Sequence, residues 1–182
     1  SQCTGKAENQ TATTSGQASG ELTGMKIAYV EIDTLLAQYN FCIDLNEGMV
    51  KKSENVRLTL NQKARELDKQ KQDFQTKYQN NAYLSPERAQ QEYNRIAKLE
   101  QDLQTLSNKL QSELMSENEK NSLQLRDSIN AFLKEYNKTK GYSMIISNTG
   151  FDNLLYADSI YNITKEIVEG LNARYSSPAA KK

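Results

Sequence analysis

The sequence contains no histidine and no tryptophan, only two prolines and two cysteines, and no excess of either charge, with 23 basic and 23 acidic residues among 182. Without histidine the commonest general base and metal ligand is missing. Two cysteines are too few for a zinc site, which takes about four Cys or His ligands. Zero net charge argues against nucleic-acid binding, which depends largely on basic residues that neutralise phosphates. We therefore expect no enzyme, no metal or other cofactor, and no nucleic-acid partner.

Hydrophobic residues are also scarce. They make up 37% of the chain, below the roughly 45–50% usual for a compact globular domain. No apolar run approaches the roughly 18–20 residues needed to cross a bilayer, so we expect no transmembrane span. The chain should be elongated or partly disordered rather than built on a thick core.

Glycine is unevenly placed. Residues 49–140 contain no glycine and only one proline, Pro86, and they are rich in Glu, Lys, Gln, Leu, Ala and Arg. These are the residues with the highest helix propensity. The spacing predicts a long helical middle, preceded by a polar tail and flanked by two small segments.

The first 24 residues are almost wholly Ser, Thr, Gly, Gln and Ala. Such a segment buries too little surface to offset its ordering entropy, so residues 1–24 are expected to form a flexible polar tether. Cys3 has two interpretations: a lipid-anchored cysteine of a membrane-tethered lipoprotein, or a solvent-exposed thiol without a role. The chain does not begin with Met, which is compatible with a processed precursor.

Two small segments, residues 25–44 and 139–175, are expected to form one β-rich body. Period-two alternation and β-branched residues predict strands there, at about 26–33, 142–147 and 153–157. An apolar stripe predicts a closing helix over about 159–173, and residues 176–182 are expected to be disordered. Cys42 is interpreted as a small core-facing residue.

The helical middle, residues 45–138, is expected to fold as an antiparallel hairpin. Two helices are separated by a break at about 80–85, where Ser85 can cap the second helix and Pro86 suits its first position. Leucines and other apolar residues recur at three-four spacing, which is typical of a coiled-coil seam. The predicted seam residues are Val56, Leu60, Leu67, Phe74, Ile96, Leu99, Leu103, Leu106 and Leu110.

The resulting fold class is α+β: a small β-rich body carrying a long coiled-coil arm. Three short strands from one chain are marginal and leave sheet edges open, so we expect association through the strands. The expected oligomerisation residues are Ile27, Tyr29, Val30, Ile32, Met144, Ile145, Ile146, Leu154 and Leu155.

The ordered part of the sequence, about residues 25–175, resembles the Skp/OmpH family of periplasmic chaperones. The resemblance lies in IAYVEIDTLL from Ile27, in the glycine-free hairpin, and in YSMII from Tyr142 followed by NLLYAD from Asn153 and Ile163-Thr164. It implies a jellyfish-like homotrimer in the periplasm, whose arms enclose unfolded outer-membrane β-barrel proteins without ATP. The alternative is a coiled-coil adaptor or structural protein of the cell envelope.

Residues 45–80 carry more basic than acidic side chains, and several aromatic residues lie close to the expected tip. One interpretation is a solvated helix face with i, i+4 ion pairs and packing across the hairpin. The other is a lining that contacts unfolded clients. On that reading the client-contact residues are Lys51, Lys52, Arg57, Lys63, Tyr78, Tyr83 and Leu84.

Overall fold

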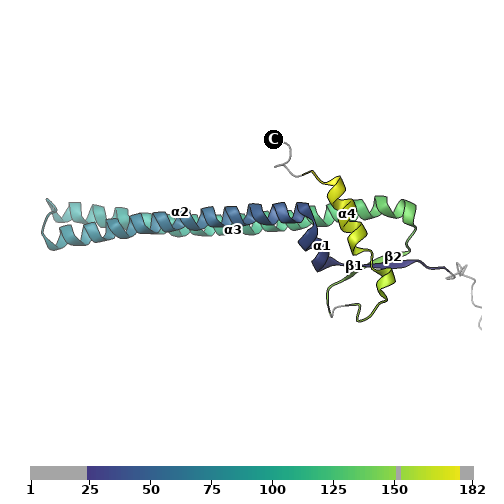
Figure 1. Cartoon of the computed structure of the whole chain (residues 1–182). Coiled ribbons are helices and arrows are strands. Elements are labelled where there is room, and N and C mark those ends of the chain that lie inside the picture. Colours follow the sequence, from purple (N-terminus) through teal and green to yellow (C-terminus); the bar gives the residue numbers. More distant parts are fainter. Residues whose placement is uncertain (1–23, 151–152, 177–182) are drawn as a thin grey trace, which may run out of the picture.

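The computed structural model describes residues 24–150 and 153–176, and shows a long two-helix arm that projects from a small body (Figure 1). Cys3, the rest of the expected tether up to residue 23, and residues 177–182 lie outside the described residues. The predicted combination of a helical hairpin with a small β part is confirmed. In chain order the elements are β1 (Ile27–Glu31), α1 (Ile32–Gln38), α2 (Asn40–Gln79), α3 (Pro86–Lys140), β2 (Met144–Asn148), the 3-10 turn η1 (Ser159–Tyr161) and α4 (Thr164–Arg174).

The arm consists of α2 and α3, which lie side by side along its length. At 1.5 Å per residue, α2 is about 60 Å long and α3 about 80 Å long. Lys71 on α2 pairs with Glu100 on α3 at 2.9 Å, and Lys52 pairs with Glu117. Because an earlier residue of α2 pairs with a later residue of α3, these contacts show that the two helices are antiparallel.

Both ends of α3 follow from local sequence. The hydroxyl oxygen of Ser85 accepts a hydrogen bond from the backbone N–H of Arg88 at 3.2 Å, and Pro86 begins the helix. Gly141 ends it at φ +70, a left-handed conformation that suits glycine. The Asn137 side chain then closes the turn, accepting from the N–H of Tyr142 and donating to its carbonyl.

The last turns of α3 extend past the start of α2 and pack on the body. Ile129, Phe132 and Tyr136 belong to the body's hydrophobic core or lie against it. The core also takes residues from β1, α1, the start of α2 and α4, and its most buried members are Ala28, Val30, Leu35, Tyr39, Cys42, Ile163, Ile167, Val168 and Leu171. One compact core therefore holds the base of the arm.

The sheet has two parallel strands rather than the expected three. β1 pairs with β2 in the register Ile27↔Met144 to Glu31↔Asn148. The strands are parallel because the hairpin carries the chain out and back before β2 begins. The other edge of β1 is occupied near Asn162: the N–H of Ile163 donates to the Tyr29 carbonyl at 3.0 Å, and the N–H of Glu31 donates to the Thr164 hydroxyl at 2.8 Å.

The predicted strand at 153–157 is wrong. This segment has no strand structure, and its Leu155 and Tyr156 are 82% and 85% exposed. Apolar residues in a short run are expected of a strand or of an exposed contact surface, and sequence alone does not separate the two. The edge of β1 that this segment could have joined is occupied by residues 162–164 instead.

The helix boundaries also differ from expectation. The arm helix α2 begins at Asn40 instead of residue 45, directly after a one-residue break at Tyr39. The Asn172 side chain bridges that break, accepting from the Asn40 N–H at 2.8 Å and donating to the Gln38 carbonyl at 3.0 Å. A partner 132 residues away in sequence thus satisfies the backbone.

Two further boundaries are corrected. The first expected strand, 26–33, ends at Glu31, and Ile32 already belongs to α1. The closing helix expected over 159–173 is divided into η1 and α4, because Asn162 leaves the helix to bridge Tyr29. Asn162 also accepts from the backbone N–H and the hydroxyl of Thr164, which orders the start of α4.

Candidate functional site

The arm is the most extended surface of the molecule, and its seam lies between α2 and α3. Among the predicted seam residues, Leu67 and Ile96 are buried. The other seven are partly buried: Val56, Leu60, Phe74, Leu99, Leu103, Leu106 and Leu110. The structure thus brings the predicted residues together along the seam, but most of them remain partly exposed to solvent.

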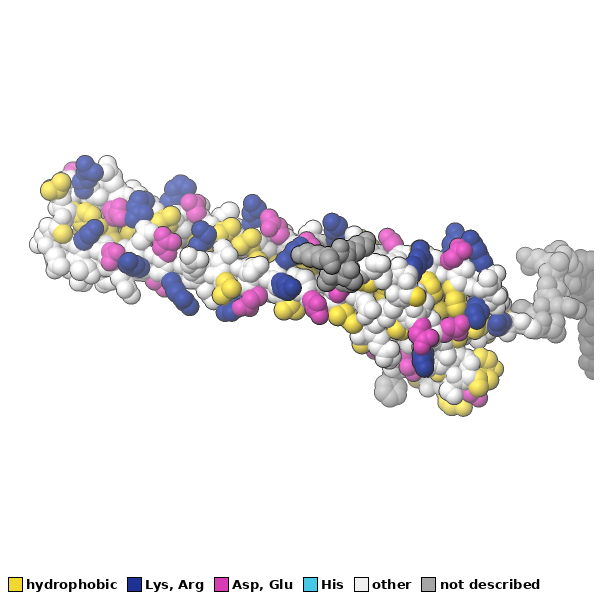
Figure 2. Space-filling model, turned by 45° about the horizontal axis from the view of Figure 1, so that its top comes forward, with side chains coloured by type: hydrophobic (Ala, Val, Ile, Leu, Met, Phe, Trp, Pro, Cys, Tyr) yellow, Lys and Arg dark blue, Asp and Glu magenta, His cyan; other side chains and the backbone are white. Residues whose placement is uncertain are grey.

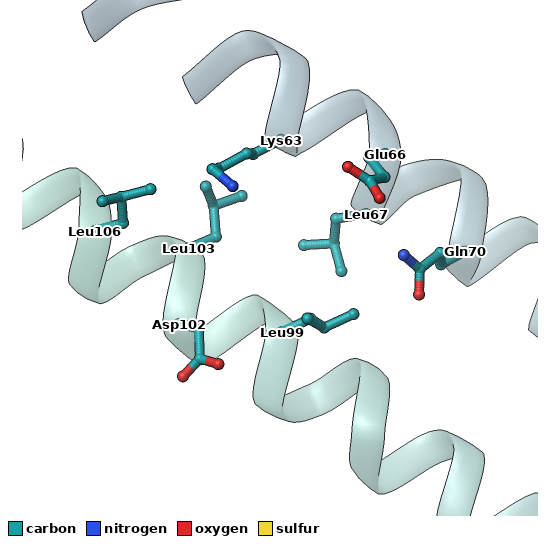
Figure 3. A pocket seen from close by; sticks show the side chains of 8 residues that line it. All are labelled: Lys63, Glu66, Leu67, Gln70, Leu99, Asp102, Leu103 and Leu106. Atoms are coloured by element: carbon teal, nitrogen blue, oxygen red, sulfur yellow. The ribbon is translucent and has the colours of Figure 1, made fainter. Parts of the chain in front are cut away.

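Shallow grooves run along both sides of this seam at mid-arm. One, of about 230 Å³, is shown in Figure 3, where Leu67 of α2 projects toward Leu99 and Leu103 of α3. The other, of about 420 Å³, lies beside Leu60, Ala64 and Leu103. Leu67 and Leu103 line both grooves, so these two leucines form the floor that separates them.

Aromatic side chains gather at the tip around Phe74. Its ring lies 5.9 Å from Tyr78, 5.7 Å from Tyr83 and 6.1 Å from Tyr93, measured between centroids. Tyr93 was missed by the sequence reading. It lies three residues before the seam residue Ile96, and helical spacing alone could have placed it beside the seam.

The tip also carries exposed apolar side chains, among them the most exposed one of the arm's described residues. Leu84 is 94% exposed, Tyr78 62% and Tyr93 57%, whereas Tyr83 is half-buried and its pKa is raised by desolvation. Residues 78–86 contain no charged side chain. An uncharged, aromatic tip can contact an apolar or weakly polar partner at little desolvation cost.

The four basic residues expected to contact clients are exposed on α2, but two of them already have acidic partners. Lys52 pairs with Glu117 across the hairpin, and Arg57 pairs with Glu54 one turn away on α2. Each pair lowers the pKa of its carboxyl through a hydrogen bond from the cation. Lys63 lines the smaller groove, and Lys51 is exposed. Figure 2 shows charged side chains of both signs interspersed along the arm.

The residues expected to mediate assembly divide between the two faces of the sheet. Val30 is 4% exposed and lies in the core, and Ile145 packs against that core. Ile27, Tyr29, Ile146 and Leu154 instead line a groove of about 320 Å³ on the opposite side of the sheet. Met144 and Leu155 are exposed, and Ile32 is partly buried against the core. Val30 and Ile145 therefore pack inside the protomer and are not available to contact another copy.

The open side of the body carries apolar residues that the sequence reading had not assigned to assembly. Met25 is 48% exposed, Tyr156 85%, Ile160 74% and Tyr161 46%. Figure 2 shows hydrophobic side chains at the lower edge of the body. Several exposed apolar side chains on one part of a protein are typical of an interaction site. Together with Met144 and Leu155, these residues form what we call the body patch.

Across residues 24–150 and 153–176, no group of three or more His, Cys, Asp or Glu side chains is arranged to hold a metal ion. Within the same residues, every helix is too short or too polar to cross a membrane.

Comparison with known proteins shows similarity to one family model and to solved structures. The family model described as "Outer membrane protein (OmpH-like)" matches residues 26–171. A crystal structure from Caulobacter crescentus CB15, described as an outer membrane chaperone (OmpH-like), superposes with a TM-score of 0.73 at 12% identity, covering 83% of this chain and 86% of that one. No curated protein matches the chain. Since the family model spans most of the sequence, the chain belongs to the OmpH-like outer membrane protein family.

Proposed function

We propose that this protein is an ATP-independent holdase chaperone of the periplasm, and that it binds unfolded outer-membrane β-barrel proteins between the arms of a homotrimer. The observation that carries the proposal is an arm of two long helices with an uncharged, aromatic tip, on a chain that belongs to the OmpH-like family. The similarity to a structure described as an outer membrane chaperone supports the same function.

The arm is better suited to holding an unfolded chain than to enclosing a small ligand. Its grooves are shallow and open, and its exposed apolar side chains are spread over the length of the hairpin. Many weak contacts along such a surface bind an unfolded chain without selecting one sequence. Because no single contact is strong, the client is released when its own folding competes with these contacts.

The body patch supports the homotrimer. A sheet of two five-residue strands is marginal alone, and the outer edge of β2 pairs with no strand among the described residues. Extra strands or apolar contacts from other copies would cover both the edge and the patch. The expected assembly surface is then Met25, Ile27, Met144, Ile146, Leu154, Leu155, Tyr156, Ile160 and Tyr161.

Two experiments test the proposal. Static light scattering should give three times the 20.6 kDa chain mass, and Leu155→Glu should reduce that mass. The control Leu123→Glu, also at an exposed leucine but on the arm, should leave the mass unchanged. A monomeric wild type at micromolar concentration would contradict the trimer.

The holding function is tested by diluting a urea-unfolded outer-membrane β-barrel protein into buffer. One trimer per client should suppress its aggregation without ATP. If a stoichiometric amount of trimer gives no suppression, the alternative of an adaptor with a folded partner is favoured.

A further inference from the structure

The two long sides of α3 differ in charge. In a helix with 3.6 residues per turn, the residue directly after each seam residue lies on one side of the seam, and the residue directly before it lies on the other. On α3 the residues that follow the seam carry a single charge: Ala97, Glu100, Gln104, Ser107, Gln111 and Met115. The residues that precede it are charged in all but one case: Arg95, Lys98, Asp102, Thr105, Lys109 and Glu113.

The grooves show that α2 and α3 contribute matching sides. The larger groove is lined by Asn61 and Asp68 of α2 and by Glu100, Gln104 and Ser107 of α3, which all follow a seam residue. Lys71 of α2 lines it as well. The smaller groove is lined by Glu66 and Asp102, which both precede one (Figure 3). We call the first side the low-charge flank and the second the charged flank. The one α3 charge on the low-charge flank, Glu100, is paired with Lys71 at 2.9 Å.

Exposed apolar side chains extend along the low-charge flank. Val50 and Met115, 68% and 69% exposed, directly follow Met49 and Leu114 near the base of the arm. Toward the tip, Tyr93 lines a groove of about 400 Å³ with Gln90, which follows buried Ala89. On α3 this flank therefore connects the aromatic tip with the body end of the arm through residues of which only Glu100 is charged, whereas on α2 it also carries Arg57 and Asp68.

We propose that the low-charge flank is the surface of the arm that binds clients, and that it takes extended polypeptide segments with few charges and alternating apolar side chains. This inference rests on the holdase function proposed above. Covering the charged flank would remove water from ions, which is costly. Covering the low-charge flank desolvates Asp68 and the Lys71–Glu100 pair at mid-arm, and otherwise mainly amides, hydroxyls and hydrocarbon.

The chemistry of the flank matches that partner. The side-chain amides of Asn61, Gln104 and Gln111 offer both donors and acceptors to an extended backbone. The thioether of Met115 adapts to apolar side chains of different shapes. Strands of membrane β-barrels alternate apolar and polar residues, so an unfolded segment of such a protein presents both kinds of group together.

Site-specific photo-crosslinking tests the assignment. A photoreactive amino acid is placed at Gln104 or at Asp102, which lie two residues apart on α3 but line opposite grooves. The probe is a urea-unfolded outer-membrane β-barrel protein. We expect several-fold more client adduct from position 104. Equal yields, or more adduct from position 102, would overturn the proposal, and so would adducts at 104 formed mainly with a second copy of the chain.

A charge variant provides a second, independent test. Asn61→Glu places a carboxylate on the low-charge flank after Leu60, and Asn55→Glu places one on the charged flank before Val56. Both positions are exposed asparagines of α2. Asn61→Glu should weaken client binding about three- to tenfold, because an unpaired charge is then covered, whereas Asn55→Glu should have little effect. If both variants keep wild-type helicity and weaken client binding equally, the flank assignment is contradicted.

These outcomes separate the two proposals. If the unmodified protein suppresses client aggregation but the flanks crosslink alike, the holdase function stands and the flank assignment fails. If the unmodified protein neither suppresses aggregation nor crosslinks to the client, the proposed function itself fails.

Discussion

Gly170 of α4 lies directly against the ring of Phe132 on α3. A Cβ atom added at Gly170 would be 2.3 Å from Cζ of that ring, much closer than van der Waals contact allows. This close approach lets α4 cross the end of the arm, and so joins the arm to the body. Phe132 continues into a row of stacked rings, with Tyr136 at 5.8 Å and Tyr142 at 6.4 Å from Tyr136.

Gly170→Ala should therefore destabilise the protein by about 1–3 kcal/mol, the usual cost of overpacking a core. The same substitution in an open helix position normally stabilises by about 1 kcal/mol. Gly48 is such a position, since an added Cβ there meets nothing within 4 Å. Urea unfolding of both variants checks the prediction, which fails if Gly170→Ala is as stable as Gly48→Ala.

Ile167 is the centre of the body core, with 0% exposure. Ile167→Ala should cost about 2–5 kcal/mol, because it removes buried hydrocarbon and leaves a cavity. Val50→Ala, at a 68% exposed position on the arm, should change stability by less than about 0.5 kcal/mol. Thermal unfolding followed by circular dichroism distinguishes them, and similar melting temperatures would show that α4 does not hold the fold together.

The Tyr175 hydroxyl donates a hydrogen bond to Asp44 at 2.8 Å. Burial, and then this carboxylate, raise the pKa of Tyr175 to about 12, whereas an unfolded tyrosine ionises near about 10. The folded state thus favours the neutral phenol, and this contribution to stability is complete below about pH 10 and is lost as the pH rises toward about 12.

Tyr175→Phe should then cost about 1 kcal/mol near neutral pH, the usual net value of one hydrogen bond. Its deficit relative to the wild type should shrink above about pH 10. Urea unfolding at several pH values measures this difference. The control is Tyr156→Phe, at an 85% exposed residue, which should leave the free energy of unfolding within about 0.5 kcal/mol of the wild type. A deficit for Tyr175→Phe that stays constant with pH would contradict the prediction.

Leu84 projects from the tip and is 94% exposed. Leu84→Ala should leave the free energy of unfolding within about 0.5 kcal/mol of the wild type, but it should weaken suppression of client aggregation. Leu58→Ala, at a 52% exposed leucine of α2, serves as the control for loss of an exposed side chain. Equal suppression by both variants would show that the tip does not contact clients.

The sequence by itself determined the arm. Helix propensity, the absence of glycine from residues 49 to 140, the Ser85-Pro86 start and the three-four spacing of leucines are local signals, each read within a few turns. They predicted two antiparallel helices with a break at 80–85, which is where the chain reverses. The charge difference between the flanks of α3 also follows from the sequence once the seam is known.

Only the tertiary structure decided the body. Residues 153–157 pair with neither strand, and Asn162 and Ile163, from farther along the chain, occupy the second edge of β1. The start of α2 at Asn40 depended on Asn172, which caps the break from α4. These contacts join residues more than 130 positions apart, and no local pattern encodes such partners. Helices that form within themselves were predictable, whereas short strands take their stability from neighbours that only folding brings together.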